Sequence, residues 1–162
     1  MPDIYHPSEN SDDVAIETIF TKIVNLNDSD VVVDVGSGEG NVIEWIYNNT
    51  SANKIIGYEV SIETFNISVK RVSKNARLEI INQDIFENFP YNANIFYLYN
   101  PFSSFYVNKF ADNILKLKHK CLIIYYNPVF LHIFKDRCEF IINEFEVMDG
   151  IPWVAIIEVS SK

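Results

Sequence analysis

Three glycines at alternating positions are the residues best suited to hold a ligand. Gly36, Gly38 and Gly40 follow the run 31–35, whose valines are typical of a strand buried on both faces, and a helix-like apolar run begins at Val42. Glycine lets the backbone approach a ligand closely, and the N-terminus of the following helix offers free N–H groups. The segment therefore predicts a nucleotide-binding turn between a strand and a helix.

Polar side chains follow the next three expected strands. Glu59 ends the second strand, Asp84 comes just after the third, and Asn100-Pro101-Phe102 follows the fourth. Ligands in open α/β sheets bind beyond the carboxyl ends of the strands, so we expect these residues to lie near the glycine turn. Carboxylate and amide oxygens accept hydrogen bonds, which suits them to bind sugar hydroxyls and amines.

The spacing of the glycines resembles that of a known family. A dinucleotide-binding fingerprint needs its third glycine at position 41, where this chain has asparagine. Asp34-x-Gly36-x-Gly38-x-Gly40 instead resembles the first motif of class I S-adenosylmethionine-dependent methyltransferases, which are Rossmann-like. The resemblance implies a small member of that family, with residues 1–162 as one S-adenosylmethionine-dependent domain after an irregular arm over residues 1–11.

The resemblance also implies a role for each residue of the expected cofactor site. In the family, the glycine turn lies against the methionine part and ribose of S-adenosylmethionine, and the acid at the end of the second strand binds the ribose hydroxyls. The acid after the third strand accepts from the adenine amine, between apolar residues that pack on the ring. The implied cofactor-binding residues are Asp34, Gly36, Ser37, Gly38, Gly40, Glu59, Val60, Asp84 and Ile85. A solvated strand-end glutamate and simple turn chemistry at Asp84 are the alternatives.

The segment Asn100-Pro101-Phe102 carries the expectation about the reaction. Many amino-methylating members of the family have Asp/Asn-Pro-Pro-Tyr/Phe here, where amide and carbonyl oxygens accept from a target amine and the ring stacks on it. This chain has one proline fewer, so the match is partial. The resemblance implies an enzyme that N-methylates an amine on a protein, RNA or small molecule, with Asn100, Pro101 and Phe102 as catalytic residues. The alternative is a proline loop with a core phenylalanine.

Two other classes of function share these motifs. A non-catalytic module of the same fold, which binds S-adenosylmethionine or a partner chain, would keep the glycine turn. A nicotinamide-dependent oxidoreductase would also have a glycine turn, but it normally ends in another parallel unit rather than a hairpin.

Alternating apolar runs predict the elements that position these residues. Strands are expected over 31–35, 54–59, 77–81, 94–99, 121–126, 139–147 and 153–159, and helices over 12–25, 61–74 and 104–118. Asn127-Pro128 is expected to open a further short helix with proline in its first turn. The last two strands predict a closing hairpin. The expected fold is α/β: a three-layer sandwich with a mostly parallel seven-stranded sheet and a C-terminal antiparallel hairpin.

Length and charge limit the classes of partner. The 162 residues, 48% of them hydrophobic, suffice for one domain with a core. The net charge of −9 disfavours broad electrostatic binding to nucleic acid, although it leaves room for a local basic patch. Cys121 and Cys138 give no metal-binding pattern and suit a reducing cytosol, and the apolar runs are too short for a membrane helix. A cytoplasmic protein without a metal and with an unidentified methyl acceptor is expected.

Overall fold

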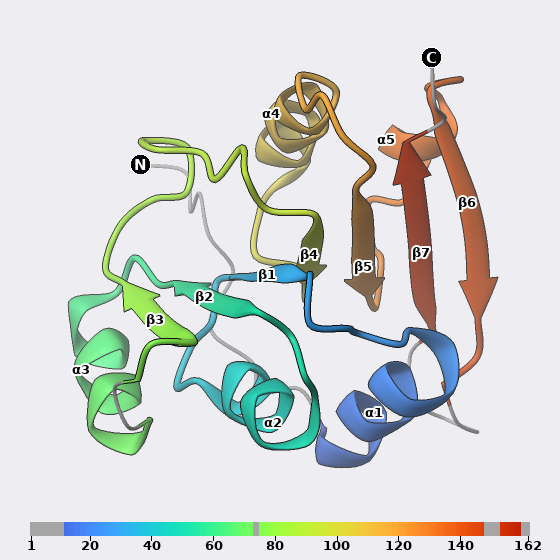
Figure 1. Cartoon of the computed structure of the whole chain (residues 1–162). Coiled ribbons are helices and arrows are strands. Elements are labelled where there is room, and N and C mark those ends of the chain that lie inside the picture. Colours follow the sequence, from blue (N-terminus) through green and yellow to red (C-terminus); the bar gives the residue numbers. More distant parts are fainter. Residues whose placement is uncertain (1–11, 73–74, 148–152, 160–162) are drawn as a thin grey trace.

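A computed structural model describes residues 12–72, 75–147 and 153–159 (Figure 1). Its centre is a seven-stranded sheet in the order β3-β2-β1-β4-β5-β7-β6. The strands are β1 (Val31–Val35), β2 (Lys54–Tyr58), β3 (Leu78–Ile81), β4 (Ile95–Leu98), β5 (Leu122–Tyr126), β6 (Phe140–Phe145) and β7 (Val154–Val159). The first five strands pair in parallel, and β7 pairs antiparallel with both β5 and β6. The expected mostly parallel sheet with its closing hairpin is confirmed.

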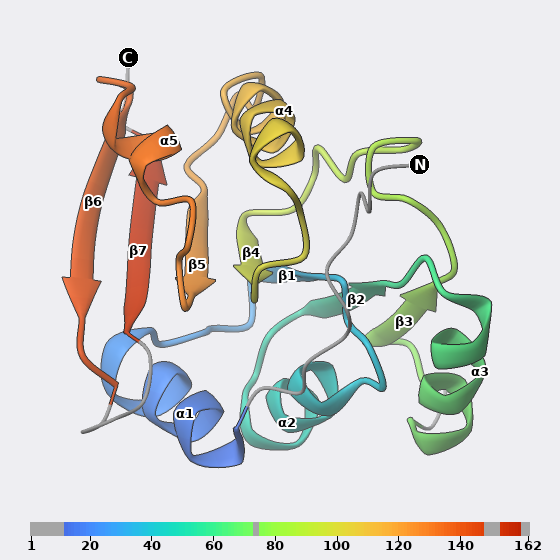
Figure 2. The same ribbon diagram turned by 180° about the vertical axis from the view of Figure 1, so that it is seen from behind.

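Helices cover both faces of the sheet, which confirms the three layers (Figure 1, Figure 2). One face carries α1, α2 and α3, and the opposite face carries α4 and α5. The helical segments are α1 (Asp13–Thr18), the π-helical turn η1 (Ile19–Ile23), α2 (Asn41–Asn49), α3 (Ile62–Arg71), α4 (Ser104–Ile114) and α5 (His132–Lys135). Within the described ranges, no helix is long and apolar enough to cross a bilayer.

The central strand β1 is apolar on both sides because both of its faces are covered. Val33 and Val35 pack in the core cluster on the α4 face, whereas Val32 packs in the cluster on the α2 face. A strand buried on both faces needs a continuous apolar run rather than an alternating one. The strand order reverses beside β1, since β2 and β3 lie to one side and β4 and β5 to the other. Such a switch point opens a crevice at the carboxyl ends of the strands.

Several element boundaries differ from the sequence-based expectation, among them those of α1 and α5. The helix expected over 12–25 has Asp12 as its N-cap, with the carboxylate accepting from Val14 N–H at 2.8 Å, and it changes to a π-helical turn at Ile19. The helix expected to open at Pro128 begins only at His132. The reason is a preceding turn: Asn127 has a φ of 47°, and the Pro128 carbonyl accepts from Leu131 N–H at 3.2 Å. The expected arm over 1–11 and the hairpin turn over 148–152 lie outside the described residues.

A glycine inside β2 allows the glycine turn after β1 to lie against the sheet. A Cβ atom on Gly57 would lie 2.7 Å from Ser37 Oγ and 2.9 Å from Ser37 Cβ, closer than real side chains approach. Gly57 pairs in register with Asp34 of β1, so the contact lies directly beneath the turn. The strand therefore has no room for a side chain at this position.

We predict that Gly57→Ala lowers the free energy of unfolding by about 1–3 kcal/mol, because the added methyl overpacks the contact with Ser37. Urea unfolding measures the change. Adding Ser37→Gly to Gly57→Ala should recover part of the loss, because the second substitution removes both clashing atoms. A Gly57→Ala protein that unfolds at the wild-type urea concentration would contradict the close approach.

Candidate functional site

The turn between β1 and α2 takes a backbone conformation that glycine favours. Gly36, Gly38 and Gly40 have φ angles of 76°, 54° and 88°, all in the left-handed region. The N–H groups of Gly36 and Ser37 both donate to the Tyr58 carbonyl at 2.9 Å, and Gly40 N–H donates to the Ser37 carbonyl at 2.9 Å. The alternating glycines thus fold the turn tightly over the end of β2.

The Glu59 carboxylate joins this turn to the start of α3. Glu59 is only 6% exposed. Its Oε2 accepts from Gly38 N–H at 2.9 Å, and its Oε1 accepts from Ser61 N–H at 2.8 Å. Each carboxylate oxygen can accept a further hydrogen bond, so the group keeps capacity for a ligand. A solvated strand-end glutamate, the alternative for this residue, is not what the structure shows, because Glu59 is a buried anchor for two loops.

Asp34 and Ser37 contribute buried polar atoms that have no hydrogen-bond partner among the described residues, namely Asp34 Oδ2 and Ser37 Oγ. Burial of Asp34, followed by the nearby charge of Glu59, raises the pKa of its carboxyl to about 8. The Asp34 carboxyl is therefore mainly protonated at neutral pH. Unpartnered polar atoms in a protein interior are exceptional, and they favour a site that a polar ligand completes.

The residues that follow β2 and β3 differ in their burial and in their hydrogen bonds. Asp84 Oδ1 accepts from Phe86 N–H at 2.9 Å. This hydrogen bond is typical of a turn, which is the alternative given above for this residue. Ile85 is buried in the core cluster on the α4 face. Val60, two residues after β2, is 42% exposed. Asn82 donates through Nδ2 to the carbonyls of Glu59 and Val60, at 2.8 and 3.2 Å, and so fixes the chain between β2 and α3.

Asn100 follows β4 in a strained conformation. Its φ is 45°, in the left-handed region that residues other than glycine rarely adopt and that is often found at functional sites. Its Nδ2 donates to the Asn127 carbonyl at 2.6 Å, and its Oδ1 accepts from Val129 N–H at the long distance of 3.4 Å. Asn127 follows β5 with a similar φ of 47°. The two Asn-Pro segments thus lie together at the ends of neighbouring strands.

Pro101 and Phe102 lie in different environments. A Cβ atom on Gly36 would lie 3.1 Å from Pro101 Cβ, so Pro101 contacts the glycine turn directly. Phe102, whose ring the resemblance implies stacks on the target amine, is 1% exposed. Its ring centre lies 5.1 Å from that of Phe86 and 6.1 Å from that of Phe110. The chain turns into α4 straight after Phe102, which directs this ring into the core.

The structure therefore brings most of the expected site residues to one edge of the sheet. Contacts join the glycine turn to Glu59 on one side and to Pro101 on the other. Sequence reasoning did not single out Gly57 and Asn82, which support the site from below and beside it. A lone glycine within a strand of bulky residues was the available signal for Gly57. For Asn82 the sequence offered no signal beyond its place after a strand.

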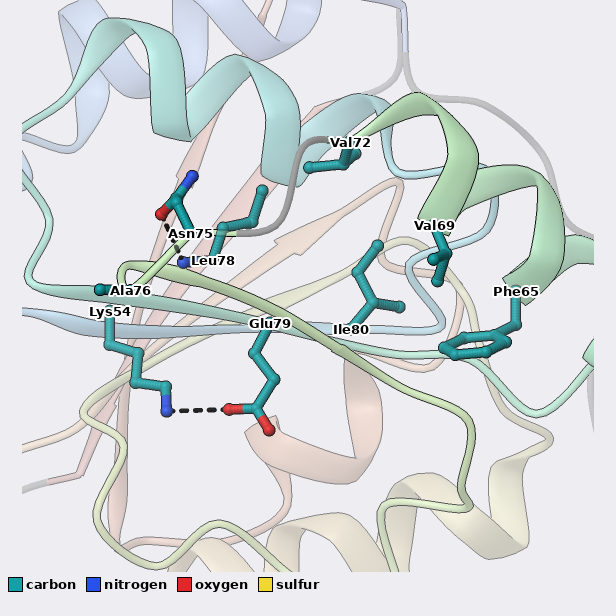
Figure 3. Close-up of a pocket in the computed structure, with 9 residues that line it drawn as sticks. All are labelled: Lys54, Phe65, Val69, Val72, Asn75, Ala76, Leu78, Glu79 and Ile80. Atoms are coloured by element: carbon teal, nitrogen blue, oxygen red, sulfur yellow. Dashed lines mark hydrogen bonds and ion pairs between the residues drawn. The ribbon is translucent and has the colours of Figure 1, made fainter.

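A separate cavity of about 580 Å³ lies between α3 and the edge strand β3 (Figure 3). Figure 3 shows Phe65 and Val69 on α3 facing Ile80 on β3, with the ion pair between Lys54 and Glu79 at 2.8 Å nearby. None of the residues expected to bind cofactor or acceptor lines this cavity.

The chain is similar to known methyltransferases both in sequence and in structure. The model of the family described as ribosomal RNA adenine dimethylase matches residues 10–120. The RNA methyltransferase of Salinibacter ruber, crystallised with S-adenosyl-L-homocysteine, has 16% identity and a TM-score of 0.73, over 96% of this chain and 95% of that chain. An rRNA methylase from Streptococcus thermophilus has 14% identity and a TM-score of 0.61, over 93% of each chain.

The plantazolicin methyltransferase BpumL, in complex with S-adenosylhomocysteine, has 12% identity and a TM-score of 0.61, over 91% of this chain and 83% of that chain. No curated protein sequence matches the chain. The structural similarities, at these identities, establish the fold. The family model covers well over half of the chain, including the glycine turn, Glu59 and the Asn-Pro-Phe segment. The chain therefore belongs to the ribosomal RNA adenine dimethylase family and is an S-adenosylmethionine-dependent methyltransferase.

Proposed function

We propose that this methyltransferase acts on the exocyclic amine of an adenine in RNA. One observation carries the proposal: Pro101 of the Asn-Pro-Phe segment packs against Gly36 of the glycine turn. The segment suited to hold an amine and the turn suited to hold the methyl donor therefore touch at the switch point between β1 and β4. The family to which the chain belongs supports adenine in RNA as the acceptor.

The residues around the glycine turn fit the methyl donor. S-adenosylmethionine supplies a methyl group already activated on a positively charged sulfonium. The Glu59 carboxylate, held by Gly38 and Ser61, is placed to accept from the ribose hydroxyls through its remaining lone pairs. Asp34 Oδ2 adds a buried polar atom without a partner among the described residues, whereas Ser37 Oγ faces Gly57 beneath the turn. We assign Glu59, Asp34 and the glycine turn over residues 36–40 to cofactor binding.

Asn100 is the residue that we assign to the acceptor. Its hydrogen bond to the Asn127 carbonyl fixes the side chain, so that the amide does not need to be ordered when substrate binds. Among the described residues its Oδ1 accepts one long hydrogen bond, of 3.4 Å from Val129 N–H. This oxygen accepts from the amine N–H and stabilises the positive charge that develops on the nitrogen as the N–C bond forms and the S–C bond of the donor breaks. Alignment of the nitrogen lone pair with the methyl carbon supplies most of the remaining acceleration.

We predict that Glu59→Gln weakens binding of S-adenosylhomocysteine by about tenfold to a hundredfold, because charge-assisted hydrogen bonds to the ribose become neutral ones. Isothermal titration calorimetry measures the affinity. Glutamine keeps an acceptor oxygen for only one of the two backbone N–H groups, so urea unfolding of the variant accompanies the titration to show that it is folded. The matched control is Glu79→Gln, on the neighbouring strand and paired with Lys54, which should bind as the wild type does. Unchanged affinity in folded Glu59→Gln would remove Glu59 from the site.

We predict that Asn100→Gly lowers methyl transfer to RNA by about 10²-fold or more while leaving the affinity for S-adenosylhomocysteine unchanged. Glycine tolerates the positive φ of this position, so the variant removes the amide without adding strain. Incorporation of labelled methyl into RNA is the readout, and Asn143→Gly on the exposed part of β6 is the control. Asn100→Asp, which keeps an acceptor oxygen, should retain more activity than Asn100→Gly. Equal activities of both variants and wild type would exclude the assigned role.

We predict that Asp34 makes the protein less stable as pH rises from acid to neutral and beyond. Its folded-state pKa of about 8 lies above its ordinary value, so its contribution is complete below about pH 4 and is lost as pH rises to about 8. The slope approaches 1.4 kcal/mol per pH unit within this window, as an order-of-magnitude estimate. The Asp34→Asn variant has no titrating carboxyl at this position. Urea unfolding should therefore show that its stability, relative to that of wild type, increases with pH. A constant difference between the two proteins would contradict the raised pKa.

A further inference from the structure

A series of aromatic rings runs from the core to the surface beside the Asn-Pro-Phe segment. The ring of Phe102 lies 5.1 Å from that of Phe86, Phe86 lies 5.6 Å from Tyr106, and Tyr106 lies 5.1 Å from Phe105. Exposure increases along the series, from 1% at Phe102 to 69% at Phe105. Phe105 has the highest exposed fraction of the large apolar residues that the structure describes.

The phase of α4 places Phe105 on the outer side of the helix. Val107, Phe110 and Ile114 form the buried face, and Phe105 lies on the opposite face in the first turn. Side chains on a helix lean toward its N-terminus. The N-terminus of α4 follows the carboxyl end of β4 after a short segment, so Phe105 lies in the turn of α4 that is nearest in the chain to Asn100 and the carboxyl end of β4.

A cation accompanies the rings. Lys109 lies one turn further along α4, with its Nζ 4.6 Å from the centre of the Phe86 ring and 5.7 Å from that of Tyr106. Its side chain is exposed. Contacts with two ring faces hold the ammonium beside the aromatic surface. In a chain with a net charge of −9, this is a local combination of positive charge and π surface.

We propose that Phe105, Tyr106 and Lys109 form a stacking surface for an unpaired RNA base that neighbours the methylated adenine. The proposal rests on RNA being the acceptor. Sequence-tolerant sites for single-stranded nucleic acid combine aromatic faces, on which bases stack, with cations that contact the backbone. Phe105 supplies the exposed face, Tyr106 supports it from behind, and Lys109 contacts a phosphate. The occupant is thus a single strand rather than a duplex or a peptide.

The surface also accounts for how an acidic protein binds RNA. The overall charge opposes broad electrostatic contact, so affinity must come from stacking and few phosphate contacts. Binding should therefore depend weakly on salt. Each phosphate contact in a single strand adds about 0.7 to the slope of log affinity against log salt, and Lys109→Gln should reduce that slope by about this amount. An unchanged slope in Lys109→Gln would remove the phosphate contact from the proposal.

The test of stacking uses a fluorescein-labelled oligoadenylate RNA, on the order of ten nucleotides long, titrated in the presence of S-adenosylhomocysteine. Fluorescence anisotropy should show that Phe105→Leu binds about tenfold more weakly than wild type or worse, because leucine keeps apolar area but has no π face. Phe105→Trp should bind at least as well as wild type. Phe145→Leu, at an exposed phenylalanine on β6 at the far edge of the sheet, is the matched control and should bind as wild type does.

The outcomes separate this proposal from the proposed function. If wild type binds the oligonucleotide and Phe105→Leu binds it equally well, the stacking surface is wrong and RNA remains the acceptor. An equal loss in Phe145→Leu also overturns it, because the effect is then not local. If wild type binds S-adenosylhomocysteine but not RNA, the RNA acceptor and the stacking surface fail together. If Phe105→Leu does not fold, weak binding by folded Phe105→Trp overturns the proposal.

Discussion

The hydrogen bond from Gly38 N–H to the buried Glu59 carboxylate is the contact on which the rest of the site depends. It ties the loop after β1 to the end of β2, while the second oxygen of Glu59 receives Ser61 N–H at the start of α3. A buried carboxylate is stable only when its oxygens are hydrogen-bonded, so the two loops and the charge stabilise one another. The glycines make this possible because left-handed φ angles turn successive N–H groups toward the end of β2.

The Asn-Pro-Phe segment, which we assign to the acceptor, lies at the same edge of the sheet but is held there by other contacts. The strand order reverses between β1 and β4, so the glycine turn and the Asn-Pro-Phe segment meet at the switch point. Pro101 packs on Gly36, and the Asn100 amide is held by the Asn127 carbonyl from the end of β5. The sheet itself thus positions the two segments that we assign to the methyl donor and to the acceptor. This is the arrangement that methyl transfer requires, because the donor is already activated and alignment dominates the rate.

The fold and the glycine turn could be predicted from the sequence. Several contacts within the site could not. The run 31–35 predicted a strand buried on both faces, and the spacing of Gly36, Gly38 and Gly40 predicted the turn, because both signals are local. The double role of Glu59 depends on contacts far apart in the sequence, which spacing does not encode. Phe102 and Phe105 are chemically equal in the sequence. Phe102 is buried before α4 begins, whereas the phase of α4 leaves Phe105 exposed. The late start of α5 follows from the positive φ of Asn127, a conformation that asparagine tolerates but does not require.

In the proposed reaction, the methyl group is transferred to the exocyclic nitrogen of an adenine in RNA. The most direct measurement is to incubate the protein with S-adenosylmethionine and RNA, digest the RNA to nucleosides and locate the methyl group by mass spectrometry. The contact of Pro101, the neighbour of Asn100, with the glycine turn predicts adenosine methylated at N6. Methylation of a ring nitrogen or of a ribose hydroxyl, or RNA left unmethylated by protein that binds S-adenosylhomocysteine, would contradict it.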